Sequence, residues 1–410
     1  MRKKITVSQL QIGMFVEQLC GSWADHPFWN TRFLIDDAHD IARLVSSPVR
    51  ELWINTARGI DVQDAPSAAK AAAQNEAILR DIASQVEPRD RPQSLEDEVA
   101  RAARICNRAR TAVISMFQEA RMGRALATDQ LVSLVSLVDD IAASVLRNPG
   151  ALISLARLKT KDDYTYLHSV AVCALMISLG RQLGLSESEA REIGLAGLVH
   201  DVGKADIPDE ILNKPGLLTE QEFERIRHHP EAGHRMLLEG QGVGAIPLEV
   251  CLHHHEKIDG SGYPDRLAGD AISLYAKMGA VCDVYDAITS NRAYKAAWSP
   301  AEALRKMTEW SAGHFDRLVF QAFVKCVGIY PVGSLVRLES GLLGVEVGNS
   351  DHNLLAPSVK TFYCTHRKAR RSPKVLDLSR INAQDKIKQW ESPANWPFPD
   401  LDELWSGTQK

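Results

Sequence analysis

The chain has 410 residues and a formal net charge of -4, and it contains no long run of Lys or Arg. Its length predicts two or three domains, and its charge argues against polymeric nucleic acid as a partner. No stretch approaches the roughly 18–20 apolar residues of a membrane span, and Gln9 and Gln11 interrupt the basic N-terminus before an apolar signal sequence can form. We therefore expect a soluble cytoplasmic protein that has no membrane partner.

Residues 1–62 are expected to form a small N-terminal domain that is mixed α/β or β-rich. The β-like runs FVEQL and ELWINT are separated by Gly13, Gly21 and the His26-Pro27 pair, which are typical of turns between strands. From 63 to 94 the composition turns to Ala, Gln, Asp, Glu and Pro without a sustained apolar period. We predict a partly helical linker there.

Two amphipathic helices are predicted between residues 95 and 150, where they would form a helical connector. Apolar residues recur at steps of three and four from Val99 to Val113 and again between Thr128 and Leu146, and the run Asn148-Pro149-Gly150 ends the pattern. The apolar faces could pack on the region that follows or on a second copy of the chain. The sequence therefore leaves a homodimer open.

Residues 151–330 are predicted to be helical, and residues 331–410 to form a small β-rich C-terminal extension and tail. Glycines and prolines break the helical pattern at intervals, and Thr219 with Glu222 matches a capping box at the start of one helix. The seven cysteines are scattered and show no CxxC spacing, which argues against a disulfide framework and a structural zinc site.

The helical region concentrates imidazole and carboxylate side chains, and eight of the thirteen histidines lie between His168 and His255. A buried pair such as His200-Asp201 is costly to desolvate, and a divalent cation compensates for that cost. Donors of this kind without cysteine favour iron, manganese, nickel or zinc over calcium or magnesium. The candidate ligands in chain order are His168, His200, Asp201, His229, His254, His255 and Asp283. They suffice for a two-metal site, which suits phosphoester hydrolysis.

Each of these features has a simpler interpretation when it is taken alone. An isolated His-Asp dipeptide is more often a helix cap or a polar surface pair. A lone histidine on an apolar helix, such as His168, is more often a hydrogen-bonded core residue. The combination on one helical block is what indicates a metal centre.

The block from about 164 to 328 resembles the HD-GYP family, the branch of the HD phosphohydrolase superfamily that hydrolyses the second messenger cyclic di-GMP. The resemblance rests on HSV at His168, LVHDVGKADIPDEILNKPGLLTEQE, HHPEAG, HHHEKIDGSGYP and AVCDVYDAITSNRAYK. The N-terminal QIGMFVEQL is similar to a domain that often precedes HD-GYP domains. The resemblance implies an all-α HD-type catalytic domain and, as partners, diguanylate cyclase proteins with a GGDEF domain.

The same resemblance implies two divalent metal ions, with iron or manganese first and nickel, cobalt or zinc as alternatives. One metal would be held by His168, His200, Asp201 and Asp283, and the second by Asp201, His229, His254 and His255. Asp201 would thus bridge both metals. Tyr164 stands where some members carry a glutamate that binds a third metal, so we expect two metals and not three.

Catalytic and substrate-binding roles also follow from the resemblance. The catalytic residues would be His200, Asp201 and Lys204. Lys204, Arg292 and Lys295 would contact substrate phosphates, where cations neutralise the charge of the attacked phosphodiester.

Two further candidates for substrate contact are Tyr263 and Asp286. Loop packing is an equally open role for Tyr263, and Asp286 could instead orient a metal ligand or the lysine. His228 and His253 are expected to be bystanders beside the true ligands.

The expected function is a metal-dependent phosphodiesterase that opens cyclic di-GMP to linear pGpG, with a further step to GMP left open. The attacking group would be a hydroxide that bridges two metals. Two alternatives stay open at this point: an HD hydrolase that acts on another nucleotide, such as a different cyclic dinucleotide, and a non-catalytic cyclic di-GMP receptor or scaffold.

Overall fold

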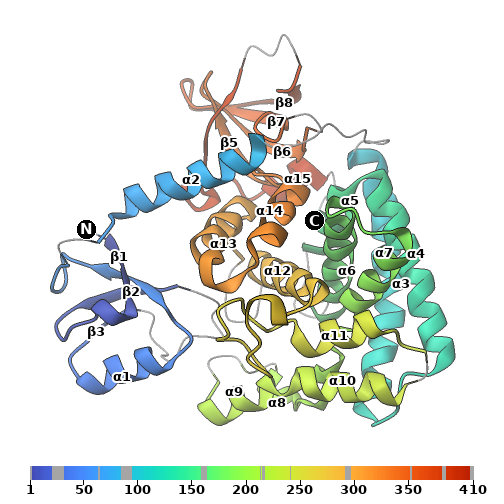
Figure 1. Ribbon diagram of the computed structural model, residues 1–410. Helices are drawn as coiled ribbons and strands as arrows, with labels where there is room; N and C mark the ends of the chain where they lie inside the picture. The colour runs from blue at the N-terminus through green and yellow to red at the C-terminus, as the bar shows by residue number, and fades with distance from the viewer. Residues whose placement is uncertain are drawn as a thin grey trace.

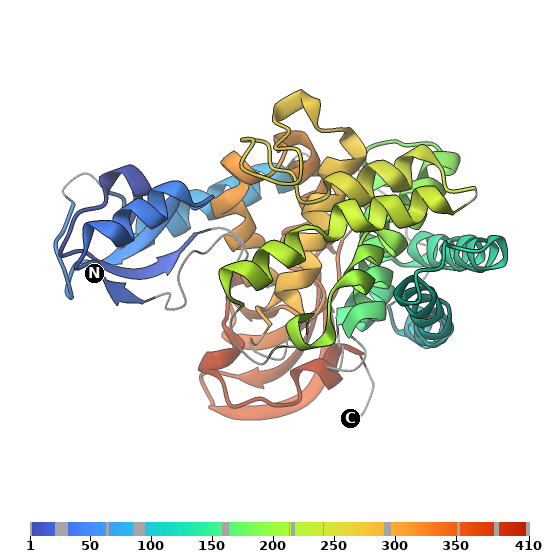
Figure 2. The ribbon, with the colours of Figure 1, turned by 90° about the horizontal axis from the view of Figure 1, so that it is seen from below.

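The computed structural model describes residues 2–20, 32–62, 65–84, 95–157, 164–212, 214, 218–240, 242–290, 297–350, 353–380 and 385–406. Figures 1 and 2 show three parts: an N-terminal sheet at one side, a helical body in the middle, and a C-terminal sheet that covers another face of this body. No helix of the described residues is both long enough and apolar enough to cross a membrane.

The N-terminal part is a four-stranded antiparallel sheet with one helix. The strands are β1 (Arg2–Thr6), β2 (Phe15–Leu19), β3 (Phe33–Leu34) and β4 (Glu51–Asn55), in the order β1-β4-β2-β3, and the helix is α1 (Ala38–Ser46). Its core contains Met14, Val16, Leu52 and Ile54, which are all buried. The prediction of a small mixed α/β N-terminal part is confirmed.

Helix α2 (Ala68–Ser84) lies in the segment that was predicted to be a partly helical linker. Its Leu79 and Ile82 are buried in the same cluster as side chains of the helical body, and it packs against α13 (Pro300–His314) and α14 (Arg317–Val327). Figure 1 shows α2 running from the N-terminal sheet toward the C-terminal sheet. This segment therefore contributes to the core.

The helical body begins with α3 (Leu95–Arg121), α4 (Thr128–Arg147), α5 (Pro149–Arg157), α6 (Tyr164–Gln182), α7 (Glu187–Val199) and η3 (Val202–Asp206). It continues with α8 (Asp209–Leu212), α9 (Glu220–Arg227), α10 (His229–Glu239), α11 (Ala245–His253), η4 (Gly269–Ala271) and α12 (Leu274–Thr289) before α13 and α14. Helix α6 lies at its centre, with 170–177 buried on every face, and contacts α3, α4, α5, α7, α12 and α14. A helix that is apolar all round is typical of such a position.

Local sequence signals explain where several of these helices begin. The Thr219 hydroxyl accepts a hydrogen bond from the Glu222 amide at 3.2 Å, and the Glu222 carboxylate accepts one from the Thr219 amide at 2.6 Å. The predicted capping box at the start of α9 is thus confirmed. Ser273 and Ser299 cap α12 and α13 in the simpler way, with a hydroxyl that accepts one backbone amide.

The C-terminal part is a five-stranded antiparallel sheet in the order β8-β7-β6-β5-β9, followed by a short helix. Its elements are β5 (Leu335–Leu338), β6 (Leu342–Gly348), β7 (Ser358–Cys364), β8 (Ala369–Asp377), β9 (Ile387–Trp390) and α15 (Leu401–Ser406). Both faces contribute apolar side chains: Val336 and Val359 join one cluster of the helical body, and Leu343 and Phe362 join the other. The predicted fold class, a helical HD-type domain between two parts that contain strands, is confirmed.

Candidate metal centre

All seven predicted ligands converge in the helical body, although they come from five separate segments. His168 lies on α6, His200 and Asp201 follow α7, and His229 begins α10. His254 and His255 follow α11, and Asp283 lies on α12. Every one of these side chains is buried except that of His255, which is partly exposed. The site therefore opens toward solvent beside His255.

The ligand atoms form two groups, each with its atoms within 4.8 Å of one another. One contains His168, His200 and Asp283, and the other contains Asp201, His229, His254 and His255. The two oxygens of Asp201 face different groups: Oδ2 lies 3.3 Å from His168 Nε2, and Oδ1 lies 3.2 Å from His229 Nε2. A carboxylate in this position joins the two groups, as a bridging ligand would.

Backbone carbonyls fix the tautomers of three histidines. The Nδ1 atoms of His200, His229 and His254 lie 2.9, 2.7 and 3.0 Å from the carbonyl oxygens of Gly197, Ile226 and Val250. A carbonyl only accepts, so each Nδ1 donates and each Nε2 presents its lone pair to the interior of the site. Metal-binding histidines are oriented in this way.

Several ligand atoms that face the interior of the site lack the hydrogen-bond donors that buried acceptors require. Within the described part of the chain, His200 Nε2 and Asp201 Oδ1 are buried without a hydrogen bond, and His229 Nε2 lies only 3.3 Å from His254 Nε2. Unpaired buried acceptors are costly, and two facing lone pairs repel each other. Cations between these atoms would relieve both problems, so the donor set fits divalent metal ions of the imidazole-binding kind.

His168 differs because both of its ring nitrogens face carboxylates. Nδ1 lies 2.7 Å from Asp286 Oδ2, and Nε2 lies 3.1 Å from Asp283 Oδ1. Burial favours the neutral ring, but bonds to Asp201, Asp283 and Asp286 outweigh it and raise the pKa of His168 to about 10. Without a metal this imidazole holds a second proton, which a metal ion at Nε2 would replace.

Three further members of the site, His254, Asp201 and Asp283, are in the charge states that metal binding requires. Burial and neighbouring imidazoles lower the pKa of His254 to about 3, so this ring is neutral at physiological pH. Burial alone would raise the pKa of Asp201, but Lys204 and His200 hold it well below its ordinary value. The pKa of Asp283 is likewise lowered well below its usual range, because bonds to His168 overcome its burial. Ionised carboxylates and neutral imidazoles are the forms that bind metals.

Lys204 lies on η3 and extends to the same carboxylate. Its Nζ is 2.5 Å from Asp201 Oδ2, and 23% of its side chain remains accessible. The ammonium group therefore lies between the buried ligands and solvent, where an anionic substrate would approach.

Asp286 lies one helical turn after Asp283 and is buried. Its carboxylate lies behind the site, where it contacts His168 Nδ1. This position favours the predicted role beside a ligand over the predicted contact with substrate. The carboxylate thus occupies the position of the outer partners that orient metal-binding histidines.

Tyr263 covers the partly exposed ligand. Its ring stacks on that of His255, with centroids 4.8 Å apart and an angle of 24° between the planes. The guanidinium of Arg227 lies on Tyr263 at 4.8 Å from the ring centroid. Arg227 was not predicted from the sequence, because it follows Glu224 by three residues, the spacing of an ordinary ion pair on a helix surface. The two side chains do form this ion pair, at 3.5 Å. The one available signal was the place of Arg227 two residues before His229.

The two predicted bystander histidines bind acidic side chains outside the site. His228 is exposed and lies 2.8 Å from Glu231. The ring nitrogens of His253 lie 3.0 Å from Glu249 and 3.0 Å from Asp265. Arg292 and Lys295, which were predicted to bind substrate phosphate, lie outside the described residues.

A glycine allows the close approach on which the second ligand group depends. A methyl group on Gly203 would lie 1.9 Å from the carbonyl oxygen of His229 and 2.4 Å from the amide nitrogen of Gly233. The HDxGK motif therefore requires glycine for packing: η3, which follows Asp201, lies directly against the first turn of α10, which carries His229.

The loop 258–264 connects this site with the N-terminal part. The amides of Ile258 and Asp259 donate to the carbonyl oxygens of His314 and Gly313 at the end of α13. Arg50, which directly precedes β4, lies 3.7 Å from the Asp259 carboxylate. The N-terminal sheet thus contacts the loop that carries Tyr263.

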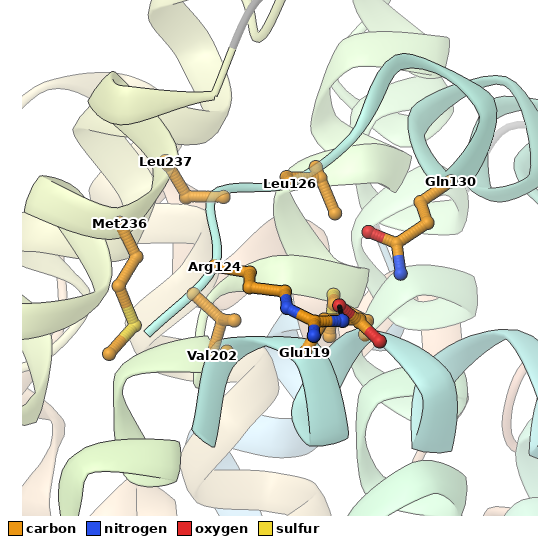
Figure 3. Close-up of a pocket in the computed structure, with 9 residues that line it drawn as sticks. Glu119, Arg124, Leu126, Gln130, Val202, Met236 and Leu237 are labelled. Atoms are coloured by element: carbon orange, nitrogen blue, oxygen red, sulfur yellow. Dashed lines mark hydrogen bonds and ion pairs between the residues drawn. The ribbon is translucent and has the colours of Figure 1, made fainter. Parts of the chain in front are cut away.

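A separate pocket, shown in Figure 3, lies between the α3–α4 turn and α10. Val202 and Leu237 line it together with Leu126, Arg124 and Gln130. Its volume of about 10 Å³ suffices for at most about one water molecule. It is therefore a packing defect next to η3 and not a substrate site.

Comparisons with families of known proteins match two regions of the chain. Residues 2–131 match a domain of unknown function designated DUF3391, and residues 138–319 match the HD domain. A cyclic di-GMP phosphodiesterase of Pseudomonas aeruginosa is 53% identical over 100% of this chain and 97% of its own length.

Two other relatives match less than half of this chain. A cyclic di-GMP phosphodiesterase response regulator of Xanthomonas campestris is 44% identical over 36% of this chain and 39% of its own length. A 3'3'-cGAMP-specific phosphodiesterase of Vibrio cholerae is 37% identical over 43% of this chain and 41% of its own length. This chain is thus similar to phosphodiesterases of more than one cyclic dinucleotide.

Proposed function

The chain belongs to the HD-GYP family of HD-domain proteins, and on this premise we propose that it is a metal-dependent phosphodiesterase that opens cyclic di-GMP to linear pGpG. The observation that carries the proposal is the position of Asp201, whose two oxygens face two separate groups of ligands. Two cations in one site are well suited to phosphodiester hydrolysis.

The donor set supports two divalent ions, with iron or manganese preferred. His168, His200 and Asp283 would hold one ion, and His229, His254 and His255 the other, with Asp201 shared. Bound there, the ions would supply Lewis acidity at phosphorus and lower the pKa of a water molecule. The protein fixes the donors: His200, His229 and His254 are oriented by backbone carbonyls, and His168 by Asp286.

The side chains at the open side of the site would bind and orient the substrate. Lys204 offers a cation beside Asp201 and would neutralise a phosphate oxygen. Tyr263, which contacts both Arg227 and His255, would offer an aromatic ring and a hydroxyl to the substrate. Arg292 and Lys295 stay proposed phosphate contacts, on the strength of their place in the NRAYK motif.

The presence of the complete ligand set supports catalysis over a receptor that only binds cyclic di-GMP. A receptor needs no bridging carboxylate, and loss of a ligand would be the expected mark of that class. The 53% identical relative over the full chain supports cyclic di-GMP over 3'3'-cGAMP, whose specific phosphodiesterase matches 43% of this chain.

Turnover of the two cyclic dinucleotides tests this assignment. Protein purified anaerobically with its metals should hydrolyse cyclic di-GMP faster than 3'3'-cGAMP, and chromatography should identify pGpG as the first product. A faster turnover of 3'3'-cGAMP, at equal metal content, would overturn the substrate assignment and leave the hydrolase class intact.

We further propose that the chain divides at residues 62, 94, 150 and 330, that it is cytoplasmic, that its partners contain GGDEF domains and that it forms a homodimer. The homodimer is supported by Val132, Val135 and Leu146, which are exposed on α4 and would lie on one stripe of the helix.

A further inference from the structure

Four arginines surround a pocket between α3 and α4 that shares no residue with the candidate metal centre. Arg101, Arg104 and Arg108 follow one face of α3, and Arg147 ends α4. The pocket has a volume of about 280 Å³, close to the lower limit of roughly 300 Å³ for small-molecule sites. Both overall views show the two helices side by side, at the edge of the molecule away from the N-terminal sheet.

A buried carboxylate holds two of these arginines in place. Glu98 is fully buried, and its oxygens accept hydrogen bonds from Arg147 at 2.8 and 2.9 Å and from Arg101 at 3.3 Å. Ser144 donates a further bond at 2.9 Å. Burial alone would raise the pKa of Glu98, but the bonds from Arg147 and Ser144 lower it, so the group stays ionised. The guanidinium of Arg147 is therefore fixed and not freely solvated.

A second anchor lies on the opposite side of the pocket. Arg108 forms an ion pair with Asp140 and donates a hydrogen bond to the Ser136 hydroxyl at 3.0 Å. Arg104 lies between the two anchors along α3, and within the described part of the chain no hydrogen bond or ion pair involves it. Four guanidinium groups against the two carboxylates of Glu98 and Asp140 leave an excess of two positive charges.

The walls of the pocket are not only cationic. Ile105, which is buried, and Ala143, which is small, line it between the arginines. Guanidinium groups bind phosphate through two parallel hydrogen bonds and also stack on flat aromatic rings. Fixed cations, an apolar surface and room for more than a phosphate group match a ligand that carries both a phosphate and a planar base.

We propose that this pocket, the α3–α4 arginine pocket, is a second ligand site that binds a phosphorylated nucleotide. The proposal does not depend on the proposed function, since no residue of the pocket belongs to the metal centre. The helices of the pocket contact α6 and α7, which position His168 and His200. A nucleotide bound in the pocket thus contacts two helices that pack directly against helices holding metal ligands.

The test compares the affinity of full-length, metal-loaded protein for three probes by calorimetry: GMP, guanosine and inorganic phosphate. We expect saturable binding of GMP, at least tenfold weaker binding of phosphate, and no saturable binding of guanosine. In Arg104→Glu the affinity for GMP should fall at least tenfold, because a carboxylate replaces the cation that has no internal partner. Arg181→Glu, at an exposed arginine in the last turn of α6, is the matched control and should bind GMP as the wild type does.

Any GMP bound at the metal centre is distinguished by its response to the variants. Binding there should be weakened by Asp201→Ala and unchanged by Arg104→Glu, whereas binding in the arginine pocket should show the reverse. Equal GMP affinity in Arg104→Glu and the wild type would overturn the proposal, as would equal affinity for phosphate and GMP. Binding to vesicles of acidic phospholipid that Arg104→Glu abolishes, without GMP binding, would instead assign the arginines to a membrane surface.

Discussion

At the scale of single residues, the metal centre depends on hydrogen bonds that lie behind the ligands. Each of His200, His229 and His254 donates Nδ1–H to a carbonyl three or four residues earlier in the chain, so the local backbone sets the ring orientation. His168 lies near the start of α6, and its Nδ1 faces the Asp286 carboxylate instead. Asp286 is therefore the outer contact most open to a test by substitution.

Replacing Asp286 by Asn should lower the affinity for metal and the rate of hydrolysis by about 10- to 100-fold. The amide keeps the size of the side chain but loses the charge that supports His168. Metal affinity can be measured by competition with a chelator, and the rate with metal in excess. Asp270→Asn, at a fully exposed aspartate, should change neither quantity. An unaltered metal affinity in Asp286→Asn would contradict the orienting role.

At the scale of secondary-structure elements, the site depends on how closely η3 and α10 approach each other. Replacing Gly203 by Ala would place a methyl group 1.9 Å from the His229 carbonyl oxygen, and backbone on both sides limits relaxation. We expect a loss of about 1–3 kcal/mol in the free energy of unfolding together with weaker metal binding. Gly348→Ala, where an added methyl group has no neighbour within 4 Å, is the control. Equal stability of the two variants in urea would refute the packing role.

The pairing of α3 with α4 should depend on pH through Glu98. The pKa of Glu98 is lowered in the folded protein because bonds from Arg147 and Ser144 outweigh burial. The ionised group therefore contributes its full share to the free energy of unfolding above the unfolded pKa of about 4.3. The contribution is lost as the pH falls through the folded pKa. Glu98→Gln should therefore be less stable by about 2 kcal/mol at pH 7, with a smaller difference below about pH 4.

Urea unfolding at pH 7 and at acidic pH measures this dependence. Glu339→Gln, at an exposed residue of the C-terminal part, should unfold like the wild type at both. A stability difference between Glu98→Gln and the wild type that stays constant with pH would show that the ion pairs do not contribute as described.

At the scale of the whole molecule, local sequence patterns predicted the order of the parts. Helices α3 and α4 carry clear apolar periods, the capping box predicted the start of α9, and β2 and β4 lie in the β-like runs FVEQL and ELWINT. Packing partners were not predictable in this way. Nothing in the composition of 63–94 indicated that Leu79 and Ile82 of α2 would be buried with α13 and α14, because that contact joins residues more than 200 positions apart.

The candidate site shows the same division. The seven ligands could be predicted because the family motifs mark them, and the structure brings them together in two groups joined by Asp201. Arg227 could not be predicted, because its contact with Tyr263 depends on how α9 lies beside the loop 258–264. The contact of Arg50 with Asp259 was equally hidden, because it depends on where the N-terminal sheet docks.

The central claim is that Asp201 joins two metal ions that the protein needs for hydrolysis of cyclic di-GMP. Metal content per chain and hydrolysis should be measured on the same preparations of the wild type, Asp201→Ala and Asp270→Ala. For the wild type and Asp270→Ala we predict two metals per chain and hydrolysis of cyclic di-GMP. For Asp201→Ala we predict fewer metals and a rate of hydrolysis lower by more than about 100-fold, which exceeds the usual effect of losing an outer contact. Hydrolysis that persists in metal-free Asp201→Ala protein would contradict the account.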